Sequence, residues 1–459
     1  MLPSTGMKFM CLFAITLGTA AALAGDLNPP PGPIGPTQRT PVNANTTPGD
    51  ATTVFAITLP GSYYLTGPVT GVAGKKGIDI RANNVWLDLS GFTLTGVGGS
   101  LSGIFINGAA HLAIFDGQIT GWGGDGIEGN ASGDNRIENI RISACGGDGI
   151  SINTASHVIN CTVSSCGGNG LVTSNEVVVT GCVAGSNGLH GIQTGTNSII
   201  KGCISISNNG SGFASSGING MNISDCTAEL NNGAGIAAPA QSLVNHCIVR
   251  GNLSGGVIAG DGSTITACTS NQNTGSGFLV TNGCTVTGCA AGQNTLTGFS
   301  ATSGATFTGC TARLNTTDGF SIGAGSTARD CTSFQNTGNG IIATFGCTIS
   351  DCTTRINTLD GIRVSSDNRV AGNTADNNGN AGDGAGIHVT SSDNRIDSNN
   401  VSDNDRGIDV DVAGNVIIRN TASGNTTNYD IIAGNSAGTI INAAGVDITS
   451  SNSWANISF

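Results

Sequence analysis

Three residues of the kinds that bind charged groups and move protons share one repeated position near the C-terminal end of the chain. Arg363, His388 and Asp409 each follow a Gly-Ile pair. A guanidinium, an imidazole and a carboxylate about 5 Å apart could bind an acidic sugar and transfer a proton. They are the candidate catalytic residues, with Asp411 beside them and a four-residue insertion around 380–385 to wall a groove. The alternative is a surface charge ladder, in which opposite charges on neighbouring strands stabilise pairing without chemistry.

A second repeated position, directly before the glycine, carries Asp125 and Asp148. Two stacked carboxylates could hold Ca²⁺ together with backbone carbonyls, which makes these two residues candidate metal ligands. Asp and Asn also precede Gly in ordinary turns, and that interpretation stays open. No other cofactor is indicated.

These positions belong to a repeat in which glycine precedes an apolar residue. Most steps between successive glycines are 21 residues, with two of 23 and one of 25. A repeat this short, without a helical period, predicts one coil of a β-solenoid, because a single coil cannot bury its own apolar side and must stack on its neighbours. Fourteen coils at about 4.8 Å each predict a rod of roughly 65 Å. The repeated pairs begin at Gly126, Gly149, Gly170, Gly191, Gly212, Gly235, Gly256, Gly277, Gly298, Gly319, Gly340, Gly361, Gly386 and Gly407.

Two further residue types recur with the same spacing as the glycines, and each set of equivalent positions is called a column below. Cysteine recurs at ten positions from Cys161 to Cys352, and asparagine recurs five residues further on, from Asn187 to Asn378. We expect the apolar anchor after each glycine and the cysteine to point inward. We expect the asparagines to form a hydrogen-bonded ladder at a turn, and the glycine to supply backbone freedom at the corner.

The N-terminus predicts export. Lys8 precedes an apolar run over 9–23, and Ala22-Leu23-Ala24 provides a small-residue cleavage site. The run is shorter than the ~20 residues that a membrane span needs, and no transmembrane segment is expected in the mature chain. The predicted organisation is a signal peptide at 1–24, an extended Pro-rich leader at 25–50, an N-terminal cap with irregular first coils at 51–125, regular coils at 126–430 and a C-terminal cap at 431–459.

Export implies an oxidising compartment, secreted or in the periplasm and cell envelope. Fourteen cysteines lie outside the signal peptide. Inward side chains stacked in parallel keep their Cβ atoms slightly too far apart for disulfides, so we favour free buried thiols. Cys145 with Cys166 is the best disulfide candidate. The net charge of −12 disfavours nucleic acid and anionic membranes as partners.

The segment Leu87-Asp88-Leu89-Ser90-Gly91-Phe92-Thr93-Leu94, followed by coils of the form Asn-x-x-x-Gly-Ile, resembles right-handed parallel β-helix proteins. That superfamily includes pectate lyases, polygalacturonases, alginate epimerases and NosD-like proteins, and the closest resemblance is to its exported bacterial members of unassigned activity. The resemblance covers about 50–450 and implies an all-β, right-handed parallel β-helix. The run of Asp pairs with Gly-His-Gly of the polygalacturonases and the Asp-Pro-His of the epimerases are missing.

Two functions remain open from the sequence. The first is an exported protein that presents a repetitive surface for extracellular glycan binding or adhesion, which the small and hydroxylated outward residues favour. The second is a polysaccharide lyase, hydrolase or epimerase acting on acidic polysaccharide, which the Arg363, His388 and Asp409 cluster favours. Whether the protein is an enzyme is therefore undecided, and an extracellular or cell-wall polysaccharide is the expected partner in both cases.

Overall fold

The computed structural model describes residues 38–459 except 131, 132, 380, 381, 383, 444, 446, 447 and 449–451. The predicted signal peptide and the first half of the predicted leader lie outside the described residues, as does part of the predicted insertion. Arg39–Phe459 form one compact unit. None of the described segments forms a helix long and apolar enough to cross a membrane.

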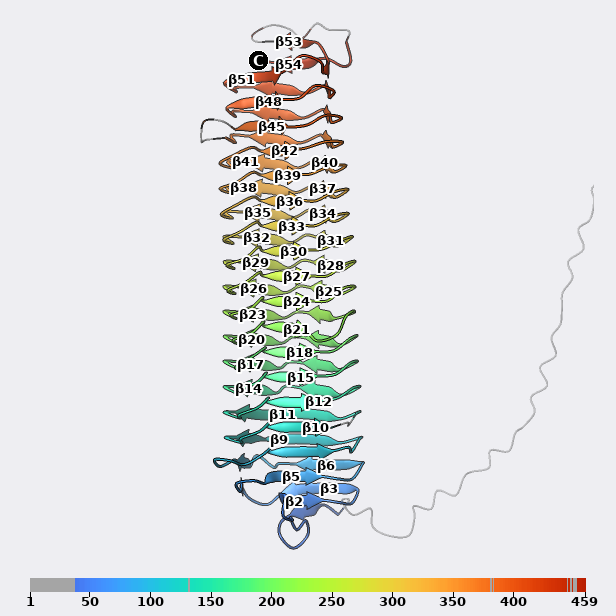
Figure 1. Ribbon diagram of the computed structural model, residues 1–459, viewed down its shortest axis with the longest axis vertical. Coiled ribbons are helices and arrows are strands. Elements are labelled where there is room, and N and C mark those ends of the chain that lie inside the picture. The colour runs from blue at the N-terminus through green and yellow to red at the C-terminus, as the bar shows by residue number, and fades with distance from the viewer. Residues whose placement is uncertain are drawn as a thin grey trace, which may run out of the picture. The chain divides into compact units, whose positions relative to one another are not determined.

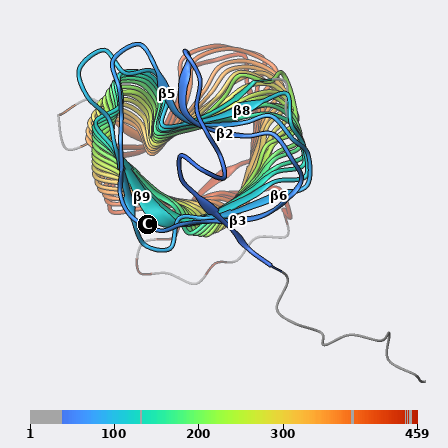
Figure 2. The ribbon, with the colours of Figure 1, turned by 90° about the horizontal axis from the view of Figure 1, so that it is seen from below.

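Each regular coil contains three short strands, for example β27 (Val257–Ala259), β28 (Thr264–Thr266) and β29 (Thr269–Asn271). Each strand pairs in parallel with its equivalent one coil later. Val257 lies beside Phe278 and Thr264 beside Thr285. The coils therefore stack one upon another (Figure 1) around a shared interior (Figure 2). The predicted all-β parallel β-helix with 21-residue coils is confirmed.

The strands form three ladders along the stack. The first ladder runs through eighteen strands of the described chain, from β2 (Thr53–Ile57) to β51 (Thr427–Ile431), and contains each strand that follows a repeated glycine. The second and third ladders contain the β28-type and β29-type strands. These two ladders join at the long strands β9 (Ala113–Thr120) and β11 (Arg136–Ser143). Each of these strands spans the corner between two faces, and the two strands pair with each other on both sides of it.

The interior is filled by stacked columns of identical positions. The anchors after the glycines are at most 1% exposed, and Phe278, Phe299 and Phe320 stack ring on ring with centroids 4.8 Å apart. Burying one such side chain contributes about 1.5–3 kcal/mol relative to exposure. The side chains of a strand alternate between its two faces. The register between a strand and its equivalent in the next coil therefore determines which side chains stack on one another in the interior.

The predicted asparagine ladder is present. Asn273 donates from its main-chain N and its Nδ2 to Oδ1 of Asn294, both at 3.0 Å, and the pattern repeats from coil to coil. The ladder satisfies buried amides where the chain turns. A further ladder that the sequence analysis did not anticipate runs through Asn368, Asn394 and Asn415.

The fourteen cysteines of the described residues are buried and free, as favoured from the sequence. Cys145 and Cys166 are also free. Thiols such as Cys268 donate weakly to a backbone carbonyl, here Thr266 at 3.2 Å. Burial raises the pKa of the Cys284 and Cys347 thiols, which keeps them protonated and poorly reactive.

The expected role of the repeated glycines is wrong. None of the fourteen has a left-handed φ. A Cβ on Gly277 would instead lie 2.7 Å from both Asn294 Nδ2 and the Gly298 carbonyl oxygen, so glycine is required for space. Many residues with a left-handed φ instead stand directly before the cysteine and asparagine columns, for example Asn160 with φ 52° and Ile356 with φ 54°. The corners are therefore made by residues other than the repeated glycines.

Candidate functional site

The structure places the three candidate catalytic residues on successive coils of the first ladder. Arg363 on β42 (Ile362–Val364) lies beside His388 on β45 (Ala385–Val389), which lies beside Asp409 on β48 (Arg406–Val410). Arg363 is exposed and His388 is half-buried. Asp409 is only 3% exposed, although its position was expected to face solvent, because its carboxylate is paired with the side chain of Arg406.

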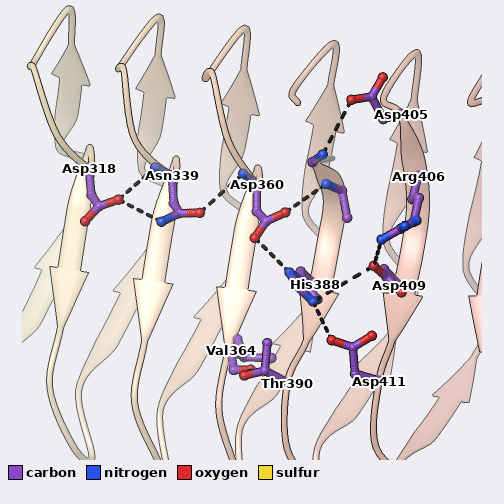
Figure 3. Close-up of polar contacts among 12 residues, drawn as sticks. Asp318, Asn339, Asp360, Val364, His388, Thr390, Asp405, Arg406, Asp409 and Asp411 are labelled. Carbon is purple, nitrogen blue, oxygen red and sulfur yellow. Dashed lines mark hydrogen bonds and ion pairs between the residues drawn. The ribbon is translucent and has the colours of Figure 1, made fainter. Parts of the chain in front are cut away.

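The His388 imidazole lies between carboxylates (Figure 3). Its Nδ1 is 2.9 Å from Asp360 Oδ2, and its Nε2 is 3.0 Å from Asp411 Oδ2 and 3.9 Å from Asp409 Oδ2. The hydrogen bond to Asp360 raises the pKa of His388 to about 9, against an opposing effect of burial. Within the described chain, no hydrogen bond or ion pair joins Arg363 to this group.

Asp409 and Asp360 are both fixed by neighbours. Arg406 Nη1 donates to Asp409 Oδ2 at 2.7 Å, and burial raises the pKa of the Asp409 carboxyl while the bond to Arg406 opposes the rise. Asp360 Oδ1 accepts the Ala385 amide at 2.8 Å, and its side chain is almost fully buried. These contacts leave little rotational freedom to either carboxylate.

Sequence reasoning missed Asp360, although a signal was available. Asp360 stands directly before Gly361, in the same column as Asp125 and Asp148. Near it the column forms a polar ladder, since Asn339 donates from its main-chain N and Nδ2 to Asp318 Oδ1 at 2.7 and 2.8 Å (Figure 3). The column before the glycines therefore extends the site around His388.

Asp125 and Asp148 hold backbone amides of the following coils. Asp125 Oδ1 accepts the Asp148 amide at 2.8 Å. Asp148 Oδ1 accepts the Asn169 amide and its Nδ2 at 2.5 and 3.0 Å. This is the turn chemistry that was left open as the alternative to a metal site, and calcium binding at this pair stays a prediction.

Asp125→Asn is expected to stabilise the protein by about 1 kcal/mol at pH 7. Burial raises the pKa of Asp125 to about 6, so the folded state loses stability as pH rises from about 4 to about 6. The expected effect stays near 1 kcal/mol because the Asp125 side chain is only partly buried and solvent screens its charge. Asparagine keeps an acceptor for the Asp148 amide and carries no charge.

Chemical unfolding of both proteins at pH 4 and pH 7 measures this effect. The free energy of unfolding of Asp125→Asn should exceed that of wild type at pH 7, and the difference should vanish near pH 4. Asp367→Asn, at an exposed position, should change the free energy of unfolding by less than about 0.5 kcal/mol. A variant no more stable than wild type at pH 7 would contradict the burial argument.

A second candidate site lies on the outer face of the second ladder, near the N-terminal end. Trp86 on β6 (Val85–Asp88) is 61% exposed, and the Phe115 ring meets it edge-on with centroids 6.5 Å apart. Both rings line a depression of about 200 Å³, together with Ala113, Ile114, Arg136 and Glu138. Arg136 Nε and Glu138 Oε2 are paired at 2.7 Å.

Sequence reasoning placed Trp86 in the irregular first coils without assigning it a role. The signal was the alternation Val85-Trp86-Leu87, which puts an aromatic side chain outward between two buried ones. Phe115 and Arg136 follow 29 and 50 positions later, so only the stacking of β6, β9 and β11 brings the three together. The result is an open aromatic surface bordered by an ion pair.

Comparison with known proteins identifies the fold. The profile of the family described as "Right handed beta helix region" matches residues 76–204, 102–253 and 173–316, more than half of the chain in total. No curated protein matches the sequence.

Three solved structures illustrate the similarity. The A-module of mannuronan C-5 epimerase AlgE4 from Azotobacter vinelandii is 15% identical over 72% of this chain and 89% of its own, with a TM-score of 0.37. Pectate lyase Pel9A is 17% identical over 66% and 80%, with a TM-score of 0.31. The tailspike gp49 of Acinetobacter baumannii bacteriophage Fri1, a capsular polysaccharide depolymerase, is 10% identical over 74% and 56%, with a TM-score of 0.29. None is similar enough for its activity to be transferred to this chain.

Proposed function

This chain belongs to the right-handed β-helix family, and from that premise we propose that it is an exported protein that binds an extracellular glycan at the depression beside Trp86. The observation that carries the proposal is the pairing of an exposed indole with a charged pair in one concave surface. A location outside the cytoplasm, secreted or in the cell envelope, is part of the proposal and rests on the predicted signal peptide.

The composition of the depression suits a sugar ring. Sugars present C–H groups on their ring faces and hydroxyls at their edges. The electron-rich face of an indole attracts the C–H groups, while Arg136 and Glu138 offer a donor and an acceptor for hydroxyls. Binding sites of this kind are mostly apolar with a few placed polar groups. Since Arg136 and Glu138 neutralise each other, a neutral glycan fits better than a highly charged one.

Contacts around His388 favour binding over the enzymatic alternative. A lyase, hydrolase or epimerase acting at Arg363, His388 and Asp409 would need a side chain free to accept or donate a proton to substrate. Both ring nitrogens of His388 are already hydrogen-bonded to carboxylates, and Asp409 is paired with Arg406.

Titration calorimetry with a panel of neutral and uronic-acid oligosaccharides tests the proposal. We expect one neutral glycan to bind, and Trp86→Ala to weaken that binding about thirtyfold, which corresponds to about 2 kcal/mol. Trp86→Phe should retain part of the affinity because it keeps an aromatic face.

Phe345→Ala is the matched control. It removes another exposed ring, 58% accessible and far along the chain from Trp86, and should leave glycan affinity unchanged. The proposal fails if the wild-type protein binds no glycan of the panel, or if Trp86→Ala and Phe345→Ala bind as well as wild type.

A further inference from the structure

We propose that His388, Asp409 and Asp411 form a binding site for a divalent transition-metal ion of the Zn²⁺ type. This inference is independent of glycan binding, because the three residues lie on the C-terminal coils and none of them lines the depression beside Trp86. It also differs from the Ca²⁺ site considered at Asp125 and Asp148.

Three ligand atoms converge on one space. His388 Nε2 lies 3.0 Å from Asp411 Oδ2 and 3.9 Å from Asp409 Oδ2, and one donor atom from each residue lies within 4.8 Å of the others. Nitrogen and oxygen ligands bind Zn²⁺ at about 2.0–2.2 Å, which sets them roughly 3–4 Å from one another. The distances from His388 Nε2 to the two carboxylates agree with this spacing, and Asp409 and Asp411 both approach the same side of the imidazole (Figure 3).

Neighbouring side chains orient two of the three proposed ligands by hydrogen bonds. His388 Nδ1 is 2.9 Å from Asp360 Oδ2, and Asp360 is 4% exposed and fixed by the Ala385 amide. A carboxylate that accepts from Nδ1–H directs the Nε2 lone pair to the opposite side, which is the usual support of a metal-binding histidine. Arg406 Nη1 donates to Asp409 Oδ2 at 2.7 Å and so orients the Asp409 carboxylate.

Charge and access favour a cation. Asp360, Asp409 and Asp411 with Arg406 leave two negative charges, which a divalent ion balances when the imidazole is neutral. The Asp411 side chain is 55% exposed, so the ion has a route from solvent and room for water as a fourth ligand. One imidazole with two carboxylates suits Zn²⁺ and similar ions, whereas Ca²⁺ takes six to eight oxygens.

Titration of metal-free, tag-free protein with ZnCl₂ tests the site, with calorimetry as the readout. We expect one tight site per chain. His388→Gln and Asp411→Asn should weaken it at least a hundredfold and tenfold respectively, and Asp360→Asn, a positioning residue, about 10–100-fold. Because Asp411 is exposed, Asp411→Asn should unfold at the wild-type temperature in EDTA, which separates loss of the ligand from loss of the fold.

Two controls decide whether the binding is specific. Arg363→Gln alters the neighbouring coil without removing a ligand. His111→Gln removes an exposed histidine whose Nδ1 pairs with Asp134 at 2.7 Å. Both should bind Zn²⁺ as wild type does. The proposal is overturned if wild type shows no tight site, if His111→Gln removes it, or if Asp411→Asn and His388→Gln leave it intact. Tighter binding of Ca²⁺ than of Zn²⁺ would overturn the choice of metal.

Discussion

Asn231→Ala is expected to lower the free energy of unfolding by about 3–5 kcal/mol, because it breaks the asparagine ladder in the middle of the stack. Asn231 is fully buried. Its Oδ1 accepts the main-chain N and Nδ2 of Asn208 at 3.1 and 2.9 Å, and its Nδ2 donates to Asn252 Oδ1 and the Ser205 carbonyl. Alanine removes all four bonds and leaves the buried Asn208 amide without its acceptor.

The adjacent residue provides the control. Asn232 is exposed, and within the described part of the chain its Nδ2 donates only to the exposed Asn209 side chain, at 3.0 Å. Asn232→Ala should change stability by less than about 0.5 kcal/mol. Thermal unfolding gives the overall effect, and hydrogen exchange of the coils around Asn208 and Asn252 gives its local extent, since coils interact chiefly with their neighbours. Equal stability of the two variants would refute a structural role for the ladder.

Phe299→Ala is expected to destabilise the protein by about 3–5 kcal/mol. The Phe299 ring stacks on Phe278 and Phe320 with centroids at 4.8 Å, and meets Phe307 edge-on at 5.8 Å. Its two stacking neighbours belong to hydrogen-bonded coils, with Phe299 paired to Phe278 on one side and Phe320 on the other. The cavity therefore cannot close by collapse along the stack, which places the cost at the upper end of such substitutions.

Phe345→Ala removes a ring of the same size from an exposed position and should be nearly neutral. Denaturant unfolding of the two variants, followed by circular dichroism, compares them directly. Phe299→Leu should recover more than half of the loss, because it refills most of the volume. A Phe299→Ala protein as stable as wild type would show that the stacked phenylalanine rings do not contribute to the free energy of unfolding.

The sequence predicted the architecture because a solenoid ties sequence position to spatial position. Residues 21 apart, such as Asn273 and Asn294, must lie one above the other once strands pair in register. Inward cysteines, the asparagine ladder and the stacking of Arg363, His388 and Asp409 followed from that rule. The role assigned to the repeated glycines was wrong. A recurring glycine indicates that a side chain is not tolerated at that position, but it does not tell whether the reason is a left-handed φ or a lack of room for a Cβ atom.

The sequence alone therefore determined in which coil each residue lies and which residues of other coils it stacks on. The reason is that a repeat of nearly constant length assigns every residue both a coil and a position within that coil. What only the tertiary structure decided is which side chains meet diagonally. Asp360 reaches His388 across 28 positions, and Phe115 meets Trp86 edge-on although Phe115 stands in the column of Asp88 and not in that of Trp86. Such meetings depend on side-chain rotamers and on local changes in coil length, which the repeat does not encode.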